Sequence, residues 1–413
     1  MERLRSYFKA YHPIVHTLLL GTMLARVAGS MSNPFIALYL YLHMQMSPEL
    51  IGLTIGFGSL AGTLGGFIGG TLSDRFGRRK VMMFSLYTWG LVFLGFSLAN
   101  SMWVFMLLST LNGLCKSFFE PVAQALMGDM TPVEKRYRVF SLRYTYVNFG
   151  VAIGPLLGAY FGISAGTVPF LITGIVYLVY AVALFALLKR FGIRQLEAQQ
   201  REKVTIGQAM QVAVRDISLR WFLIGGILGS LAYVQFTVSL SQIVEQTVVD
   251  GVVLYSWLMT TNAVIVVLTS MWLSRWAEKR SPIQAIFIGN LFYMVGCIGF
   301  AFSQSWTMFI LSTVIFTLGE VLTFPSNNVL IDRLAPAGMR GAYYGANSFK
   351  DFGRFLGPWL GGLLMTHFGG SVMFLIIGAV TVCGTLFYRQ GLRHSADLFA
   401  PKPAATPSKT QSA

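Results

Sequence analysis

The sequence predicts an all-α membrane protein in which twelve transmembrane helices form two pseudosymmetric six-helix bundles. Three observations carry this prediction. Apolar residues make up 54% of the 413 residues and charged residues only 11%, a composition that suits lipid rather than water as the solvent. Apolar runs of about 20 residues follow one another along the chain, and the loops between them alternate in charge. The two halves also match each other at an offset of about 200 residues.

Each predicted span is an apolar run cut at charged, proline-rich or glycine-rich breaks. The spans are 14–39, 48–72, 81–98, 102–127, 139–161, 167–188, 219–244, 252–273, 283–302, 306–330, 342–368 and 372–388. A charged segment near mid-chain resembles a linker between bundles, and the last residues are rich in Pro, Ser, Thr and Ala, a composition typical of disorder. We therefore predict an N-terminal six-helix bundle (1–188), a cytoplasmic linker (189–218), a C-terminal six-helix bundle (219–390) and a disordered cytoplasmic tail (391–413).

The distribution of Lys and Arg gives the orientation. Nearly all basic residues lie at the two termini or in every second loop, and the intervening loops carry none. By the positive-inside rule, both termini and the basic loops are cytoplasmic in a multi-pass protein of the cell membrane. The formal net charge of +15 forms no continuous basic face, which argues against nucleic-acid binding.

Glycine and proline positions reveal the internal repeat. Gly150, Gly154, Pro155 and Gly158 in the fifth span recur as Gly353, Gly357, Pro358 and Gly361 in the eleventh. Chance agreement at so many spaced positions is improbable, and internal repeats of this kind build many transporters.

The sequence lacks the motifs of several kinds of protein chemistry, which argues against those functions. Cys115, Cys297 and Cys383 are far apart in apolar runs, which favours neither a disulfide framework nor a metal site. There is no phosphate-binding loop and no His-Glu-x-x-His zinc motif. We therefore expect no enzyme activity, no cofactor and no metal, with transport driven by an ion gradient. The expected partners are a small-molecule substrate, protons and the lipid bilayer, and nothing implies an oligomer, so we expect a monomer.

The loop after the second span carries the most specific motif. It contains Gly70, Asp74, Arg75, Gly77 and Arg78. This spacing resembles the signature loop between helices two and three of the major facilitator superfamily, and with the repeat and span count the resemblance covers almost the whole chain. It implies the major facilitator fold and a gating role for Asp74 and Arg78.

In that family, the acid that pairs with the arginine often lies at the cytoplasmic end of helix four, where this sequence has Asp129. The alternative is that the basic loop only sets the topology.

The fifth span resembles the glycine-proline motif of the antiporter branch, whose members are usually exporters. The residues concerned are Gly150, Gly154, Pro155 and Gly158, although the second terminal glycine of the family pattern is Ala159 here. The resemblance implies outward transport. The alternative is ordinary packing through small residues, which applies in any case.

Ionisable residues inside spans are costly, of order 2.5 to 3.5 kcal/mol each, so they usually face a cavity or a partner. Arg26, Lys116, Glu120 and Glu320 lie in spans one, four and ten, and the family resemblance implies that these spans line the central cavity. Lys116 and Glu120 are one helical turn apart, so they either face the cavity or neutralise each other as an intrahelical ion pair.

Glu320 has no basic residue one turn away on its own helix, which favours a role in binding a proton or a cation. A carboxylic acid in an apolar cavity can exchange protons near neutral pH. A second charged cluster, Lys350, Asp351 and Arg354, lies on span eleven, whereas Glu245 is predicted to be a solvated rim residue.

One position departs from the family pattern. Antiporters of the family usually have an Arg in helix four where this chain has Ser109. Arg26 or Lys116 could take over the role of that Arg. The sequence resembles the multidrug branch, so the leading hypothesis is proton-coupled efflux of hydrophobic, drug-like compounds. The alternative is a proton-coupled carrier of a defined polar metabolite such as a sugar, amino acid or siderophore.

Overall fold

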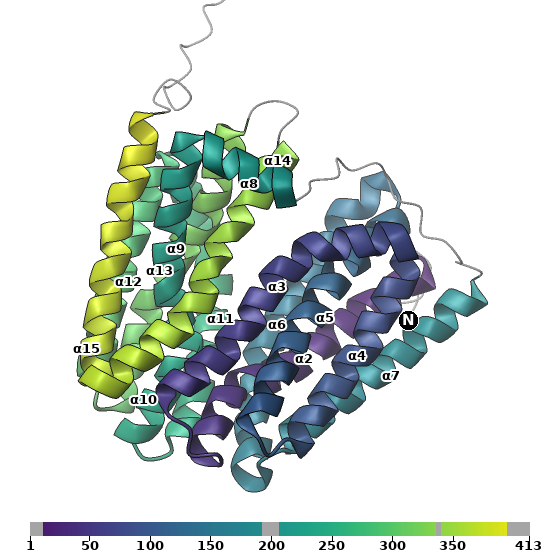
Figure 1. The fold of residues 1–413 in the computed structure, drawn as a ribbon, viewed down its shortest axis with the longest axis horizontal. Coiled ribbons are helices and arrows are strands. Elements are labelled where there is room, and N and C mark those ends of the chain that lie inside the picture. Colours follow the sequence, from purple (N-terminus) through teal and green to yellow (C-terminus); the bar gives the residue numbers. More distant parts are fainter. Residues whose placement is uncertain (1–10, 192–205, 336–339, 395–413) are drawn as a thin grey trace, which may run out of the picture.

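The computed structural model of the chain describes residues 11–191, 206–335 and 340–394 (Figure 1). The helices of the first half are α2 (Pro13–Leu42), α3 (Pro48–Phe76), α4 (Arg78–Leu98), α5 (Met102–Asp129), α6 (Val133–Ala165) and α7 (Val168–Arg190). Those of the second half are α8 (Ile206–Arg215), α9 (Ile217–Thr237), α10 (Ser239–Thr247), α11 (Gly251–Glu278), α12 (Pro282–Phe302), α13 (Trp306–Leu334), α14 (Arg340–Asn347), the 3-10 turn η1 (Ser348–Asp351) and α15 (Phe352–Arg393). The predicted tail lies almost entirely outside the described residues.

Nine helical segments of the described chain are long and apolar enough to cross a membrane. The last of them, Gly345–Arg393, has the length of two spans and turns at Gly369, whose φ of +82° suits only glycine. Gly353 lies against Ile227 of α9 and Gly391 lies against Ser218, so the two arms of α15 are antiparallel. With these arms counted separately and α9 and α10 counted together, the structure has twelve membrane-length helical segments, which confirms the predicted fold class.

The seventh span is broken where α9 meets α10. Val238 lies between the two helices with φ of −120°, and its N–H still donates to the Val234 carbonyl at 3.0 Å. Side-chain hydrogen bonds add to the backbone ladder here: Gln235 donates to the Gly357 carbonyl at 2.7 Å and Ser239 donates to Gln235 at 2.6 Å. The Thr237 carbonyl accepts a hydrogen bond from the Tyr255 hydroxyl at 3.0 Å. The break therefore leaves few polar groups unsatisfied in the membrane interior.

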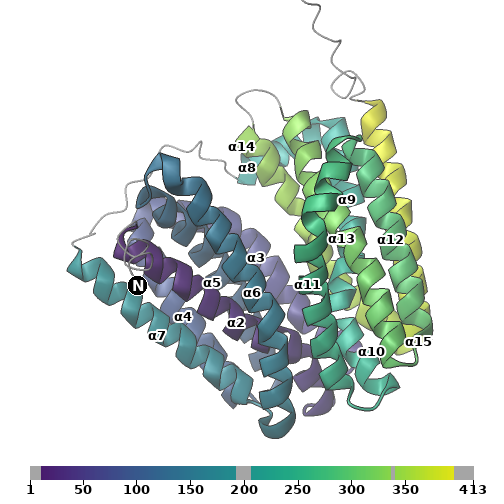
Figure 2. The same ribbon diagram turned by 180° about the vertical axis from the view of Figure 1, so that it is seen from behind.

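The helices form two bundles, α2–α7 (the N-bundle) and α9–α15 (the C-bundle), which lie side by side in both views (Figures 1 and 2). Small residues set the helix contacts in both. A methyl group at Gly150 would lie 2.8 Å from the Val27 backbone nitrogen of α2, and one at Gly353, its counterpart in the repeat, would lie 2.5 Å from the Ile227 carbonyl oxygen of α9. The predicted repeat therefore corresponds to equivalent close helix approaches in the two bundles.

The bundles meet mainly at one end, which we call the distal end, opposite the linker end that holds α8 and α14 (Figures 1 and 2). There α3 packs on α15 and α6 packs on α11. Thr260 of α11 donates to the Ala152 carbonyl of α6 at 2.8 Å, and Gln246 of α10 donates to the Tyr41 hydroxyl of α2 at 2.7 Å. Towards the linker end the bundles diverge (Figure 2).

The predicted linker contains a helix. Helix α8 packs on α14 at the linker end, and the Tyr343 hydroxyl of α14 donates to Oδ2 of Asp216 at 2.6 Å. Oδ1 of Asp216 accepts from the backbone N–H of Leu219 at 3.0 Å and thereby caps α9. Asp216 therefore connects the linker, the start of the seventh span and α14.

Candidate functional site

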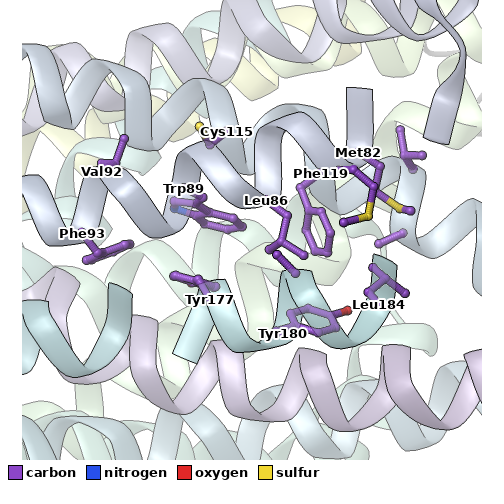
Figure 3. Packing of buried hydrophobic residues seen from close by; sticks show 14 of the residues in the cluster. Met82, Leu86, Trp89, Val92, Phe93, Cys115, Phe119, Tyr177, Tyr180 and Leu184 are labelled. Atoms are coloured by element: carbon purple, nitrogen blue, oxygen red, sulfur yellow. The ribbon is translucent and has the colours of Figure 1, made fainter. Parts of the chain in front are cut away.

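The N-bundle encloses a cavity of about 160 Å³. Its lining residues come from five helices, α2, α4, α5, α6 and α7. Aromatic side chains form one wall: Trp89 stacks on Tyr177 with ring centroids 4.6 Å apart, and Phe119 lies beside them (Figure 3). All three rings are buried, so this wall is a rigid part of the core.

Glu120 of α5 pairs with Arg26 of α2 across this cavity. Nη2 of Arg26 donates to Oε1 of Glu120 at 2.5 Å, and the two side chains are 29% and 25% exposed. The intrahelical pair of Glu120 with Lys116, one of the two sequence-based alternatives, is not formed. A guanidinium from the facing helix satisfies the carboxylate instead, and the Lys116 side chain stays exposed to the cavity.

A fourth charged residue of the cavity, Arg143 of α6, was missed in the sequence. It lies seven residues, about two helical turns, before Gly150, and a methyl group at Gly150 would contact the Arg26 side chain. Arg143 therefore lies on the helix face that turns towards α2. The spacing of Arg143 from the glycine motif could have predicted that it faces α2. The glycine motif was interpreted only in terms of helix packing and direction of transport.

The C-bundle holds Glu320 of α13 in a different way. Its Oε2 accepts a hydrogen bond from Nδ2 of Asn262 of α11 at 2.7 Å, and the same amide lies 3.0 Å from the Thr317 hydroxyl. Asn262 is buried. Within the described residues Glu320 makes no ion pair. The sequence did not predict Asn262, because it lies 58 residues away on another helix.

The cluster predicted on span eleven lines a smaller cavity of about 40 Å³ in the C-bundle. Arg354 pairs with Asp351 at 3.4 Å, and its guanidinium lies 5.8 Å from the ring centroid of Tyr233. Lys116 of the N-bundle lies within electrostatic range of both Asp351 and Arg354. The charged groups of the two bundles therefore face a common central region.

Among the motif residues of the N-bundle, Gly77 has a structural role in the described chain. Gly77, with φ of +90°, forms the turn between α3 and α4, as its glycine identity predicts. The backbone around Gly70, Asp74, Arg75, Arg78 and Asp129 is helical, but their side chains lie outside the described set. The gating role of these residues therefore stays a prediction.

The glycines of the antiporter motif pack against α2. Gly154 and Gly158 lie against the carbonyls of Val27 and Met31, so the packing role expected of small residues is present. Ser109 is buried, with its carbonyl against Gly58 of α3. It therefore lies in a helix contact and does not line the N-bundle cavity.

A third cavity, of about 200 Å³, lies at the distal end between the bundles. Tyr39 and His43 of α2, Phe170 of α7 and Glu245 of α10 are among its lining residues. Glu245 is not the solvated rim residue that the sequence predicts: its Oε2 is buried and has no hydrogen-bond partner in the described part of the chain. It lies near the distal end of α10, the second part of the broken seventh span.

The arrangement of two packed bundles around facing charged cavities matches a known family. The family model described as Major Facilitator Superfamily matches residues 18–349 and, in a second match, residues 251–412. The chain belongs to the major facilitator superfamily. It is therefore a multi-pass membrane transporter of the secondary type and not an enzyme.

Among its major facilitator relatives, the MFS-type transporter YqjV of Bacillus subtilis (strain 168) is 36% identical over 93% of this chain and 95% of its own length. A Na(+), Li(+), K(+)/H(+) antiporter of Planococcus maritimus is 27% identical over 90% of this chain and 93% of its own. Multidrug resistance protein MdtG of Escherichia coli (strain 55989 / EAEC) is 24% identical over 91% and 93%.

Solved major facilitator structures share the fold. The nucleoside transporter NupG superposes with a TM-score of 0.79 at 11% identity, covering 92% of this chain and all (100%) of that one. The peptide transporter POT in complex with sulfate gives a TM-score of 0.76 at 15% identity over 94% and 96%. At these identities the likeness concerns the fold alone.

Proposed function

We propose that the chain is a proton-coupled exporter of hydrophobic, drug-like compounds that works by alternating access. In this proposal the linker end faces the cytoplasm, as the basic loops favour. The bundles contact each other at the distal end and diverge at the linker end, an arrangement typical of a transporter open to the cytoplasm. Rocking of the bundles about the central region would expose it to the other side.

The observation that carries the proposal is the setting of Glu320. This acid lies within a membrane-spanning helix, its described hydrogen-bond partner is the uncharged Asn262, and it makes no ion pair in the described chain. An amide can donate to a carboxylate or to the carbonyl oxygen of a protonated acid, so both protonation states keep the contact. An acid in this position can bind and release a proton during the cycle.

Two further observations support exchange of substrate for protons. The glycines that resemble the antiporter motif hold α6 against α2, the helix that contributes Arg26 to the cavity. Relatives named as a cation/proton antiporter and as a multidrug resistance protein cover most of the chain, at 27% and 24% identity. Together they favour antiport and efflux for this chain.

The test is gradient-driven uptake into everted vesicles, with a cationic dye (ethidium) and an anionic dye (carboxyfluorescein) measured in parallel. We expect the wild type to accumulate at least one dye only when the lumen is acidified. The Glu320→Gln variant should lose this dependence, whereas Asp250→Asn, an exposed control at the distal end, should keep it. Gradient-independent uptake by the wild type, or normal coupling in Glu320→Gln, would contradict the proposal.

The second candidate, a proton-coupled carrier of a defined polar metabolite, is favoured by one specific observation. The N-bundle cavity presents Lys116, Arg143 and Asn33 alongside the Arg26–Glu120 pair, more polar groups than an apolar drug needs. If the wild type inserts normally but accumulates neither dye, the drug-efflux proposal is wrong, and a metabolite screen under the same gradient tests this candidate.

A further inference from the structure

The charges of the N-bundle cavity do not balance. Three basic side chains, Arg26, Lys116 and Arg143, line it together with a single carboxylate, Glu120. The carboxylate is already engaged by Arg26. Within the described chain neither Lys116 nor Arg143 makes an ion pair or a hydrogen bond. Two positive charges in the interior of this bundle therefore have no ion-pair partner of their own among the described residues, and share the field of a carboxylate that Arg26 already binds.

Unpaired basic groups in a membrane-spanning bundle are costly, and they usually face a cavity or a partner. Water in the cavity lowers this cost but does not neutralise the charge. A bound anion would neutralise it. Arg143 offers a planar fork of donors and Lys116 a compact ammonium, the two groups that proteins use to bind carboxylates and phosphates.

The rest of the cavity suits an apolar body attached to such an anion. Trp89, Phe119 and Tyr177 form the aromatic wall (Figure 3). Trp89 donates to Asn112 at 2.6 Å, and Asn112 donates in turn to Asn33 at 3.2 Å, so a chain of hydrogen bonds fixes both the wall and a cavity-lining amide. The volume of about 160 Å³ is near the size of apolar cavities of roughly 150 Å³ that hold one benzene ring.

We propose that the N-bundle cavity binds an amphipathic organic acid through its unpaired basic side chains, Lys116 and Arg143, with the first ring or chain of the acid against the aromatic wall. This inference rests on the proposed function and names its substrate class: organic anions rather than lipophilic cations. The substrate charge then sits in the N-bundle and the coupled proton on Glu320 of the C-bundle. Substrate and proton therefore do not compete for one acid.

The test is equilibrium binding at fixed pH, without a gradient, to purified protein in neutral-lipid nanodiscs. Radiolabelled phenylacetate is compared with benzyltrimethylammonium, which has the same ring and the opposite charge. We expect saturable binding of phenylacetate and none of the ammonium compound. Lys116→Gln and Arg143→Gln should each weaken phenylacetate binding about 10- to 100-fold, the usual range for loss of a charge-assisted hydrogen bond.

Control variants distinguish a local role of Lys116 and Arg143 in anion binding from a general effect of the protein's positive charge. Lys279→Gln removes one positive charge at an exposed position on the helix end and should leave binding unchanged. Lys116→Arg keeps the charge and should restore most of the affinity that Lys116→Gln loses. Equal loss in Lys279→Gln, or no loss in both cavity variants with normal thermal stability, would overturn the anion site.

Failure of this inference can be told apart from failure of proton coupling. Because the proton and the anion occupy different bundles, Glu320→Gln should bind phenylacetate with nearly wild-type affinity while losing gradient-driven flux. Anion binding that depends on Lys116 and Arg143, together with gradient-independent flux, would keep the site and refute proton coupling. Gradient-driven flux of ethidium with no binding of phenylacetate would refute the anion site and keep the coupling.

Discussion

The N-bundle and the C-bundle share a helix arrangement but hold their charges differently. In the N-bundle, Arg26 and Glu120 pair between helices, and two further basic groups face the cavity. In the C-bundle, Asp351 and Arg354 pair within one turn of the chain, and Glu320 is bound to a neutral amide. Glycines at equivalent positions maintain the backbone repeat. The comparison teaches that a repeated scaffold can hold a cavity rich in basic groups in one half and an acid bound to a neutral amide in the other.

Removing a carboxylate from each pair tests this difference most strongly. Glu120→Gln breaks a pair whose side chains are 25% and 29% exposed and leaves Arg26, Lys116 and Arg143 without the carboxylate of their cavity, so we expect a cost of about 1 to 3 kcal/mol. Asp351→Asn breaks a pair whose side chains are 31% and 39% exposed, so we expect less than about 0.5 kcal/mol. Unfolding of both variants in detergent, followed by tryptophan fluorescence, measures the two effects.

The double variant Arg26→Gln/Glu120→Gln is the control, because it removes both partners and should recover part of the stability lost in Glu120→Gln. Similar losses in Glu120→Gln and Asp351→Asn would mean that the two pairs are equivalent and that the contrast between the bundles is wrong.

Alanine at one close-packed glycine in each bundle tests the shared scaffold. A methyl group at Gly113 would meet the Gly58 carbonyl of α3, and one at Gly319 would lie 2.6 Å from the Gly289 carbonyl of α12. We expect Gly113→Ala and Gly319→Ala each to cost about 1 to 3 kcal/mol, because a backbone neighbour must move. Gly229→Ala, where no atom lies within 4 Å, should leave thermal stability almost unchanged. A loss confined to one bundle would refute the structural equivalence.

The smallest expected effect concerns Glu245, where the C-bundle presents an acid to a cavity lined by the N-bundle. In the closed distal end its Oε2 is buried with no hydrogen-bond partner in the described chain, whereas an opened distal end would hydrate it, so closure favours the uncharged, protonated acid. This contribution to closure is present at low pH, below the ordinary glutamate pKa of about 4.3, and is lost as the pH rises. Distances between spin labels at Gln45 and Val249, in a Cys383→Ser background, measure closure against pH.

Glu245→Gln resembles the protonated acid, so it should remain closed across the pH range and lose this pH dependence. His43 lines the same cavity and Asp250 lies nearby, so His43→Gln serves as the control. If the pH dependence persists in Glu245→Gln but vanishes in His43→Gln, the assignment to Glu245 is wrong.

The sequence was sufficient for those features that depend on local composition. Span lengths, the glycine repeat and the turn at Gly77 follow from residues close together in the chain. The ion-pair and hydrogen-bond partners of the charged residues in the spans could not be predicted from the sequence. Arg26 and Glu120 are 94 residues apart, and a plausible local partner, Lys116, stood one turn from Glu120. Only helix packing decides between such alternatives.

Two other positions escaped prediction for related reasons. The break at Val238 depends on hydrogen bonds from Gln235 to α15, which no pattern within the seventh span reveals. Glu245 resembled a surface residue by its place near the end of a span, but the opposing bundle covers it. In both places, contacts between distant segments override the local sequence pattern.

The contact between α3 and α15 has a consequence for how the bundles change their angle. Gly52 lies against the Pro358 carbonyl and Gly362 against the Pro48 carbonyl, so backbone meets backbone with no interlocked side chains at these points. Interlocked side chains would have to leave one set of grooves and enter another whenever the bundles changed their angle. At these two points the bundles can change their angle without such an exchange, whereas Phe57 of α3 packs edge-to-face on Phe355 of α15. This ring pair is therefore the part of the contact that must rearrange when the bundles pivot.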